Sequence, residues 1–192
     1  MPSQPFRTLF LCQENACRSI MAEAILRDMD DRFEVFSAGS HPAAAIDPDT
    51  RLLLGSLGHD TTPLRTKSWA SFATSTAPAL DFVFTVCDRT MGEICPSWPG
   101  DPITAHWSIP DPTLAQGNTA ERALARCEVY QMLAQRISIF MSFPLETLDR
   151  LALTNRIAAL GRLRSISHES AGRQDYSPVY NSQATISDRH NG

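Results

Sequence analysis

Eight consecutive residues near the start of the chain carry the groups for nucleophilic chemistry on an oxyanion. They are Cys12, Gln13, Glu14, Asn15, Ala16, Cys17, Arg18 and Ser19. An apolar run at 9–11 precedes them and a helical apolar pattern begins at Met21, which predicts a strand, a tight loop and a helix. A loop that leads into a helix N-terminus presents backbone N–H groups and partial positive charge, and this combination binds tetrahedral anions such as phosphate or arsenate.

Cys12 is the predicted nucleophile of this loop. The Arg18 guanidinium offers a planar pair of donors to two oxygens of the anion. The positive field that holds an anion also favours a thiolate, so we expect a depressed pKa for Cys12. We expect Ser19 to donate a hydrogen bond to the sulfur and Asn15 to hold the loop through side-chain bonds to the backbone. The alternative, a buried strand-end cysteine beside a surface arginine, is less favoured because arginine and serine follow at this spacing between a strand and a helix.

The remaining pattern predicts a parallel α/β domain that positions this loop. Strands are expected over residues 6–12, 33–36, 81–87 and 103–107, and helices over 19–31, 48–58, 69–72, 119–142 and up to Gly161. Strands that alternate with helices form a parallel sheet with helices on both faces. Ligands bind beyond the carboxyl ends of such strands, where Cys12, Cys87 and the residues after Trp107 are placed.

The long helix after Asn118 has an apolar stripe in the sequence. Its members are Ala120, Leu124, Cys127, Tyr130, Ala134, Ile137 and Met141. This stripe predicts that Cys127 belongs to the core rather than to a reactive site.

Composition limits the classes of partner. The 192 residues are 43% hydrophobic, which suits one core, and the formal net charge of −4 gives no reason to expect nucleic acid or an acidic membrane surface. The sequence shows no signal-peptide pattern and no apolar run long enough to span a bilayer. Five cysteines, an odd number, indicate a reducing cytoplasm with thiols kept for chemistry or packing. The cysteines and histidines do not have the spacing of a metal site.

The end of the chain differs in composition from the rest. Residues 165–192 are rich in Ser, Asn, Gln, Asp and Arg, without periodic apolar positions. We therefore expect a folded domain over 1–164 and a disordered polar tail over 165–192.

Several separate motifs, taken in order, resemble one family. They are Cys12-x5-Arg18-Ser19, the run 37–42 (Ser-Ala-Gly-Ser-His-Pro), the run 84–88 (Phe-Thr-Val-Cys-Asp) with Cys95-Pro96, His106-Trp107, and Pro110-Asp111-Pro112. Together they look like the arsenate reductases built on the low-molecular-weight phosphotyrosine phosphatase fold. The resemblance covers roughly residues 6–161. It implies a single domain with a four-stranded parallel sheet flanked by helices, and thiol-dependent reduction of arsenate to arsenite in the cytoplasm.

The resemblance also implies roles for individual residues. Cys12 is the expected nucleophile, Arg18 the oxyanion clamp, and Asp111 the general acid that protonates the departing oxygen. Loop residues 13–19 bind the oxyanion, for which phosphate and sulfate compete. Cys87 and Cys95 resemble the redox pair of the thioredoxin-coupled branch, in which one thiol releases arsenite and the other passes the disulfide to a reductant.

Three features leave alternatives open. The spacing from Cys87 to Cys95 is one residue longer than in the thioredoxin-coupled branch and resembles relatives that use glutathione with glutaredoxin, so the implied donor is either thioredoxin or that system, and no bound cofactor is implied. Glu14 stands where the family commonly has glycine, and we expect its side chain to face solvent because a positive φ or an inward carboxylate would be unfavourable there. Cys17 is either a small loop filler or a partner for Cys12 in a protective disulfide.

Two other functions compete with the reductase. One is a phosphotyrosine phosphatase, because the loop chemistry is shared. Thr113 and Leu114 follow Asp111-Pro112 where such phosphatases usually carry aromatic residues, and a phosphatase has no use for Cys87 and Cys95. The other is a non-catalytic oxyanion or redox sensor, supported by Glu14 and the tail and opposed by Asp111 and the complete Cys-x5-Arg motif.

Overall fold

The fold is described from a computed structural model. It describes residues 4–91 and 95–163, which include all the expected strands and helices. The predicted disordered tail lies outside the described residues.

Four parallel strands form one sheet in the order β2-β1-β3-β4. The strands are β1 (Phe6–Cys12), β2 (Phe33–Gly39), β3 (Phe82–Thr85) and β4 (Ile103–His106). The α-helices are α1 (Arg18–Met29), α2 (Pro48–Ser56), α3 (Asp88–Met91), α4 (Thr119–Met141) and α5 (Arg150–Leu160), and two short 3-10 helices are η1 (Trp69–Phe72) and η2 (Pro112–Leu114). These elements confirm the predicted single α/β domain with a four-stranded parallel sheet.

Local signals in the sequence explain where the helices begin. Asp47 caps α2, since its Oδ2 accepts a hydrogen bond from the Thr50 N–H at 3.0 Å, and proline occupies the first helical position. Asn118 and Glu121 form a capping box at the start of α4. The predicted starts of both helices are confirmed.

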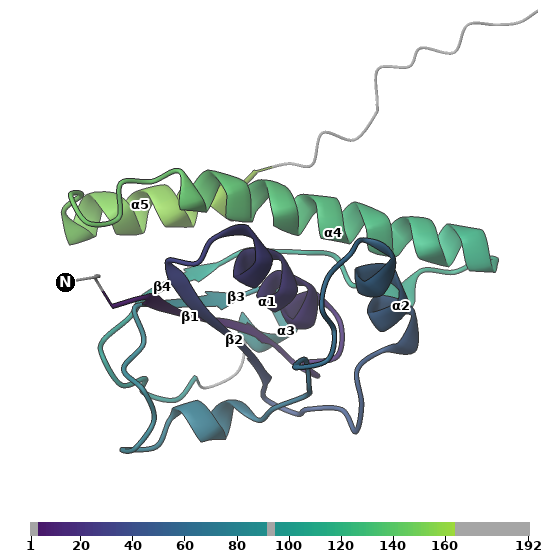
Figure 1. The fold of residues 1–192 in the computed structure, drawn as a ribbon, viewed down its shortest axis with the longest axis horizontal. Coiled ribbons are helices and arrows are strands. Elements are labelled where there is room, and N and C mark those ends of the chain that lie inside the picture. The colour runs from purple at the N-terminus through teal and green to yellow at the C-terminus, as the bar shows by residue number, and fades with distance from the viewer. Residues whose placement is uncertain (1–3, 92–94, 164–192) are drawn as a thin grey trace, which may run out of the picture.

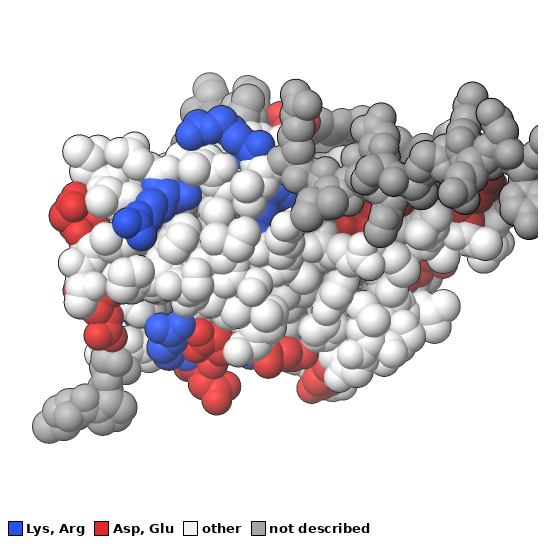
Figure 2. Space-filling view, turned by 90° about the horizontal axis from the view of Figure 1, so that it is seen from above, with Lys and Arg blue, Asp and Glu red and all other residues white. Residues whose placement is uncertain are grey.

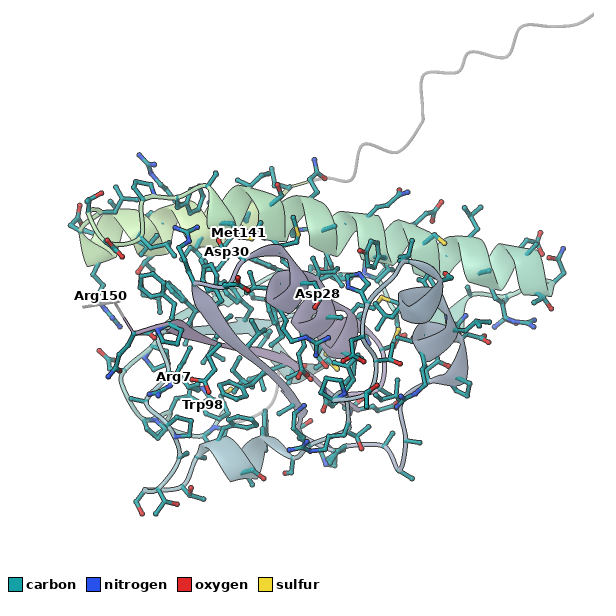
Figure 3. The ribbon with its side chains drawn as sticks, viewed as in Figure 1. Arg7, Asp28, Asp30, Trp98, Met141 and Arg150 are labelled. Carbon is teal, nitrogen blue, oxygen red and sulfur yellow. The ribbon has the colours of Figure 1, made fainter. Side chains whose placement is uncertain are left out.

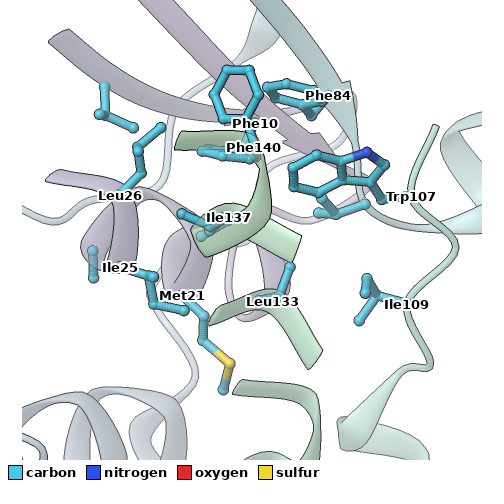
Figure 4. Packing of buried hydrophobic residues seen from close by; sticks show 14 of the residues in the cluster. Phe10, Met21, Ile25, Leu26, Phe84, Trp107, Ile109, Leu133, Ile137 and Phe140 are labelled. Carbon is cyan, nitrogen blue, oxygen red and sulfur yellow. The ribbon is translucent and has the colours of Figure 1, made fainter. Parts of the chain in front are cut away.

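Most of the core lies between one face of the sheet and helices α1 and α4 (Figures 1 and 4). Phe10 and Phe84 are paired across β1 and β3 with ring centroids 5.4 Å apart, and Trp107 stacks on Phe84 at 4.3 Å. The opposite face carries Leu9, Leu11 and Val83, and it is covered by η1 and by loops. The alternation along β1 places Phe10 and Cys12 on the helix-covered side of the sheet.

The buried residues of α4 differ from the apolar stripe that the sequence predicts. The buried residues of α4 are Arg126, Val129, Leu133, Arg136, Ile137 and Phe140, whereas Leu124 is 60% exposed and Cys127 is only half-buried. The prediction that Cys127 belongs to the core is therefore wrong. The pattern misled because two arginines occupy buried positions: Arg126 pairs with Asp47, and Arg136 donates to the Leu160 and Leu163 carbonyls at the end of α5. Figure 2 shows the outer side of α4 and α5, where the visible charged groups lie mostly toward the edges.

None of the helices in the described part of the chain is long and apolar enough to cross a membrane.

One buried hydroxyl allows a stability prediction. Thr8 on β1 is fully buried, and its Oγ1 finds no hydrogen-bond partner among the described residues. Replacement Thr8→Val removes this unsatisfied group at nearly constant volume, so we expect the free energy of unfolding to rise by about 1 kcal/mol. Urea denaturation of the two proteins measures this difference, and a less stable variant would contradict the interpretation.

Candidate active site

The loop from Cys12 to Arg18 closes around backbone contacts with the segment after β2. Its carbonyls accept three hydrogen bonds: Gln13 O from His41 N (2.9 Å), Glu14 O from Ala43 N (2.9 Å), and Ala16 O from Asp47 N (3.0 Å). Because a trans peptide directs its N–H away from its carbonyl, this arrangement turns loop N–H groups toward the opposite side. The Asn15 N–H, for example, points at Cys12 Sγ at 3.2 Å. The loop thus has the form expected of an oxyanion cradle.

Gly39 at the end of β2 is required by the close approach of this loop. A Cβ at that position would lie 2.4 Å from Gln13 O and 2.9 Å from Asn15 N. Any side chain there would push the loop away from the sheet. The glycine of the 37–42 motif is therefore explained by packing against the loop.

Cys12 Sγ lies at the end of β1 with only 3% of the residue exposed. The Ser19 hydroxyl is 2.9 Å from the sulfur, and the Asn15 side-chain amide donates to Ser19 Oγ at 2.9 Å. Since Ser19 Oγ is accepting from Asn15, its own hydrogen is available for the sulfur. The predicted contact between Ser19 and Cys12 is confirmed. Asn15 makes a side-chain bond to the backbone, as predicted: its Oδ1 accepts from the Lys67 N–H at 2.7 Å.

The expected depression of the Cys12 pKa is wrong for this structure. Burial raises the pKa of the Cys12 thiol, and this effect exceeds the lowering caused by the Ser19 hydrogen bonds; the nearby Cys87 raises it further and Arg18 lowers it only weakly. The Arg18 guanidinium makes its hydrogen bonds to groups other than the sulfur. Its Nη2 donates to Asp111 Oδ2 at 2.6 Å, and its Nη1 donates to Ile109 O at 3.1 Å.

Asp111 comes to the site from the loop before η2. Its Oδ1 accepts from the Thr113 N–H at 3.1 Å and from Thr113 Oγ1 at 2.7 Å, which fixes the carboxylate as the cap of η2. The structure brings Cys12, Arg18 and Asp111 to one cavity of about 380 Å³. The other lining residues are Gln13, Glu14, Ala16, Cys17, Ala43, Ala45, Ile46, Asp47, Pro48 and Thr113.

The predicted loop residues divide between the cavity wall and its support. Gln13, Glu14, Ala16, Cys17 and Arg18 line the cavity, whereas Asn15 and Ser19 are fully buried behind it. Glu14 is exposed, as expected. The positive φ of the loop falls on Asn15 (50°) rather than on Glu14, and asparagine tolerates this conformation better than most residues.

Cys17 is held in place as a neutral thiol. Thr50 Oγ1 gives its hydrogen to Asp47 Oδ2 at 2.7 Å, so the Cys17 thiol donates to Thr50 Oγ1 across 3.1 Å. Burial raises the pKa of Cys17 to about 12. These contacts favour the interpretation of Cys17 as a structural loop residue.

Cys87 lies two residues beyond β3, near the end of β1 that carries Cys12. The Val86 N–H donates to Leu11 O at 2.8 Å, so Cys87 follows β3 beside the point where Cys12 ends β1. Cys87 is fully buried in the same core cluster as Cys12, and its sulfur makes a hydrogen bond with the Thr90 hydroxyl. Asp88, the next residue, is 2.9 Å from His106 Nε2 and thereby ties this segment to β4. Cys95 is exposed and does not line the cavity.

The site includes residues that the sequence did not single out. Ser37 accepts from Asn15 Nδ2 at 2.8 Å and donates to Glu23, and Lys67 Nζ lies 3.1 Å from Glu23 Oε2. Asp47 connects the loop to α4 through Arg126 at 3.0 Å. Among these residues, only Glu23 could have been recognised from the sequence, because its carboxylate interrupts the apolar pattern of α1. The described residues contain no cluster of three His, Cys, Asp or Glu side chains that could hold a metal ion.

Comparison with known proteins places the chain in a family. Residues 7–151 match the family described as low molecular weight phosphotyrosine protein phosphatase. The chain belongs to this family. An arsenate reductase of Shouchella clausii is 31% identical over 132 residues, which cover 68% of this chain and 91% of the relative. An arsenate reductase of Halalkalibacterium halodurans is 29% identical over the same coverage.

Solved members of the phosphatase family share the fold. The thioredoxin-dependent arsenate reductase of Corynebacterium glutamicum superimposes with a TM-score of 0.54 at 25% identity, covering 77% of this chain and 66% of that one. A low molecular weight phosphotyrosine phosphatase of Vibrio cholerae gives the same TM-score at 21% identity, covering 74% of this chain and 99% of the phosphatase. The phosphatase-like fold expected from the motifs is confirmed, and both branches of the family adopt it.

Proposed function

We propose that this protein reduces arsenate to arsenite at the expense of thiols, with Cys12 as the nucleophile. The observation that carries the proposal is the meeting of Cys12, Arg18 and Asp111 on one cavity, with the buried thiol of Cys87 just beyond β3 in the same core cluster as Cys12. The cavity supplies an oxyanion site, and the neighbouring thiol supplies the electrons that a phosphatase does not need. The relatives named arsenate reductase support this choice.

The first step forms a bond between sulfur and arsenic. Arg18 exchanges its contacts with Asp111 and Ile109 for the arsenate oxygens, which the loop N–H groups also hold, while the Cys12 thiolate attacks arsenic. Asp111 takes up a proton from solvent once Arg18 has turned to the anion, and passes it to one hydroxyl of arsenate, which departs as water. Ser19 favours the thiolate because its hydroxyl donates to Cys12 Sγ.

The second step transfers two electrons to arsenic. The Cys87 thiolate attacks Cys12 Sγ, a sulfur–sulfur bond forms, and the electron pair of the sulfur–arsenic bond leaves with arsenic. Arsenic is thereby reduced from As(V) to As(III) and departs as arsenite, while the two sulfurs are oxidised to a disulfide. Cys95 then exchanges with this disulfide, which frees the Cys12 thiolate and leaves a Cys87–Cys95 disulfide for an external thiol to reduce.

The external donor is either thioredoxin or glutathione with glutaredoxin. The Corynebacterium glutamicum relative is thioredoxin-dependent, which favours the first, whereas the longer Cys87–Cys95 spacing favours the second. The protein itself needs no bound cofactor in this scheme. A reaction that consumes thiols fits the reducing cytoplasm indicated by the cysteine content.

A phosphotyrosine phosphatase is the second candidate, favoured by the family and by the shared loop. Against it, the cavity lining includes no aromatic side chain from the described residues that would stack on a tyrosine ring. A sensor without turnover remains the third candidate.

Replacement Asp111→Asn tests the proton donor. We expect arsenate turnover to fall about a hundredfold, because an amide cannot protonate the departing oxygen. Phosphate binding, measured by titration calorimetry, should stay within severalfold, because the cavity keeps Arg18. The matched control is Asp101→Asn, which alters an exposed aspartate paired with Arg150. An unchanged rate in Asp111→Asn would reassign the acid.

Arsenate-dependent NADPH oxidation tests the proposed activity. The purified protein is assayed in parallel with a thioredoxin system and with a glutathione–glutaredoxin system, with Cys95→Ser as the variant that separates them. Thioredoxin-driven turnover that requires Cys95 supports the internal relay. Turnover with glutathione and glutaredoxin alone keeps the reductase without Cys95. Hydrolysis of an aryl phosphate without arsenate turnover would favour the phosphatase, and arsenate binding without either activity would favour the sensor.

A further inference from the structure

A buried series of hydrogen bonds connects the Glu23 carboxylate of α1 to the nucleophile. Starting from the sulfur, it passes through Ser19, Asn15 and Ser37 to the carboxylate of Glu23. Ser19, Asn15 and Ser37 are fully buried, and Glu23 is 7% exposed. Helix α1 thus places the Glu23 carboxylate inside the domain, where a charged group is stable only when it is paired.

Lys67 supplies that pairing. Its Nζ lies 3.1 Å from Glu23 Oε2 and 3.5 Å from Oε1, and it also donates to Arg65 O at 3.1 Å. The two side chains are 15% and 9% exposed. An ammonium and a carboxylate therefore neutralise each other behind the loop that holds the oxyanion.

The main chain of Lys67 contacts the same network. Its N–H donates to Asn15 Oδ1 at 2.7 Å, and its carbonyl accepts from the Gly39 N–H at 2.9 Å. The first contact fixes which end of the Asn15 amide faces the two serines, because the oxygen is held by Lys67 and the NH2 group must turn toward Ser19 and Ser37.

The direction of every hydrogen bond in this series follows from the groups at its two ends. A carboxylate of Glu23 only accepts, so the Ser37 hydroxyl donates to it and receives from Asn15. The second hydrogen of the Asn15 amide goes to Ser19 Oγ, which leaves the Ser19 hydrogen directed at Cys12 Sγ. A hydrogen donated to sulfur stabilises the thiolate relative to the thiol.

We propose that Lys67 and Glu23 are positioning residues for Cys12, which act through Asn15 and Ser19 to keep a hydrogen bond directed at the nucleophilic sulfur. This inference rests on the proposed function only in assigning the nucleophile to Cys12. The other ionisable groups that act on that sulfur are Arg18, Cys17 and Cys87, and Glu14, Asp47 and Asp111 line the same cavity. None of them takes part in this series of hydrogen bonds.

The test is the pH dependence of Cys12 alkylation by iodoacetamide, resolved by peptide mass spectrometry so that the exposed Cys95 is counted separately. Replacement Lys67→Met leaves the Glu23 charge unneutralised, which disfavours a nearby thiolate. We expect Cys12 alkylation at pH 7 to fall about tenfold, the change that corresponds to one unit of pKa, and to recover at higher pH. Lys67→Arg should restore most of the rate, because the charge returns.

Two further variants keep the test decisive. Ser37→Ala breaks the link between Glu23 and Asn15 while the Lys67–Glu23 pair remains, and it should shift the alkylation profile in the same direction. Arg7→Met is the matched control. Arg7 lies near the start of β1 (Figure 3), and its replacement breaks an exposed pair with Glu34, whereas Cys12 ends that strand. Unchanged alkylation profiles in folded Lys67→Met and Ser37→Ala, with only a lower melting temperature, would overturn the inference. A shifted profile in a protein without arsenate turnover would overturn the proposed function and leave this inference in place.

Discussion

Replacement Cys12→Ser is expected to abolish arsenate reduction, with a loss of roughly 10⁴-fold or more. The reason is chemical as well as structural. A serine oxygen can form an ester with arsenic, but it cannot accept attack by a second thiol and release arsenic with an electron pair. Arsenate-dependent NADPH oxidation with either donor system measures the loss.

The matched control for this variant is Cys127→Ser. Cys127 is half-buried on α4 and does not line the cavity, so its replacement should leave the rate within about twofold, as expected for a substitution that touches no reacting group. Turnover of Cys12→Ser near that of the wild type would remove Cys12 from its assigned role. Oxyanion binding should survive the serine substitution, because Arg18 and the loop N–H groups are unchanged.

The site residues that the sequence predicted most directly are close to one another in the sequence. Cys12, Arg18 and Ser19 lie within one strand–loop–helix unit, and this unit determines their geometry, so reading the residues in order was sufficient. Asp111 was harder, because the chain also contains Asp47-Pro48 and Asp101-Pro102; its place after a strand end favoured it, and the resemblance decided it. The fold was predictable for a similar reason: alternation along β1, the Asp47-Pro48 cap and the Asn118–Glu121 box are short-range signals.

The part that the sequence did not predict depends on contacts between distant segments. Lys67 reaches Asn15 and Glu23 across more than forty positions in the chain, and no local pattern announces such a contact. Arg126 and Arg136 occupy buried positions of α4 because partners elsewhere satisfy them, which shifted the predicted apolar stripe.

The prediction of a lowered pKa for Cys12 was wrong for the same reason. The field of the loop was inferred from its residues, but burial of the sulfur and the engagement of Arg18 by Asp111 are properties of the assembled site. The thiolate therefore depends on the hydrogen bonds from Ser19 and Asn15 more than the sequence suggested.

Replacement Cys87→Ser should separate the reductase from the phosphatase. In the proposed mechanism the first step needs Cys12, Arg18 and Asp111, whereas only the second step needs Cys87. We expect steady-state arsenate reduction with the thioredoxin system to fall at least about a hundredfold, because the neighbouring thiol that resolves the Cys12–arsenic bond is lost. Alkylation of Cys12 and phosphate binding should remain close to those of the wild type.

The buried position of Cys87 sharpens this expectation. Its sulfur is fully buried and hydrogen-bonded to Thr90, and a serine hydroxyl keeps that bond with little change in volume, so the fold should be retained. A matching thermal melt for Cys87→Ser and for Cys127→Ser would show that any loss of turnover is chemical. Because the second thiol lies inside the domain beside Cys12, an external thiol must enter through the cavity to replace it, past the carboxylates of Glu14 and Asp47. Undiminished turnover of Cys87→Ser with thioredoxin would exclude Cys87 from the relay, and undiminished turnover with glutathione and glutaredoxin alone would show that the cavity admits the external thiol directly.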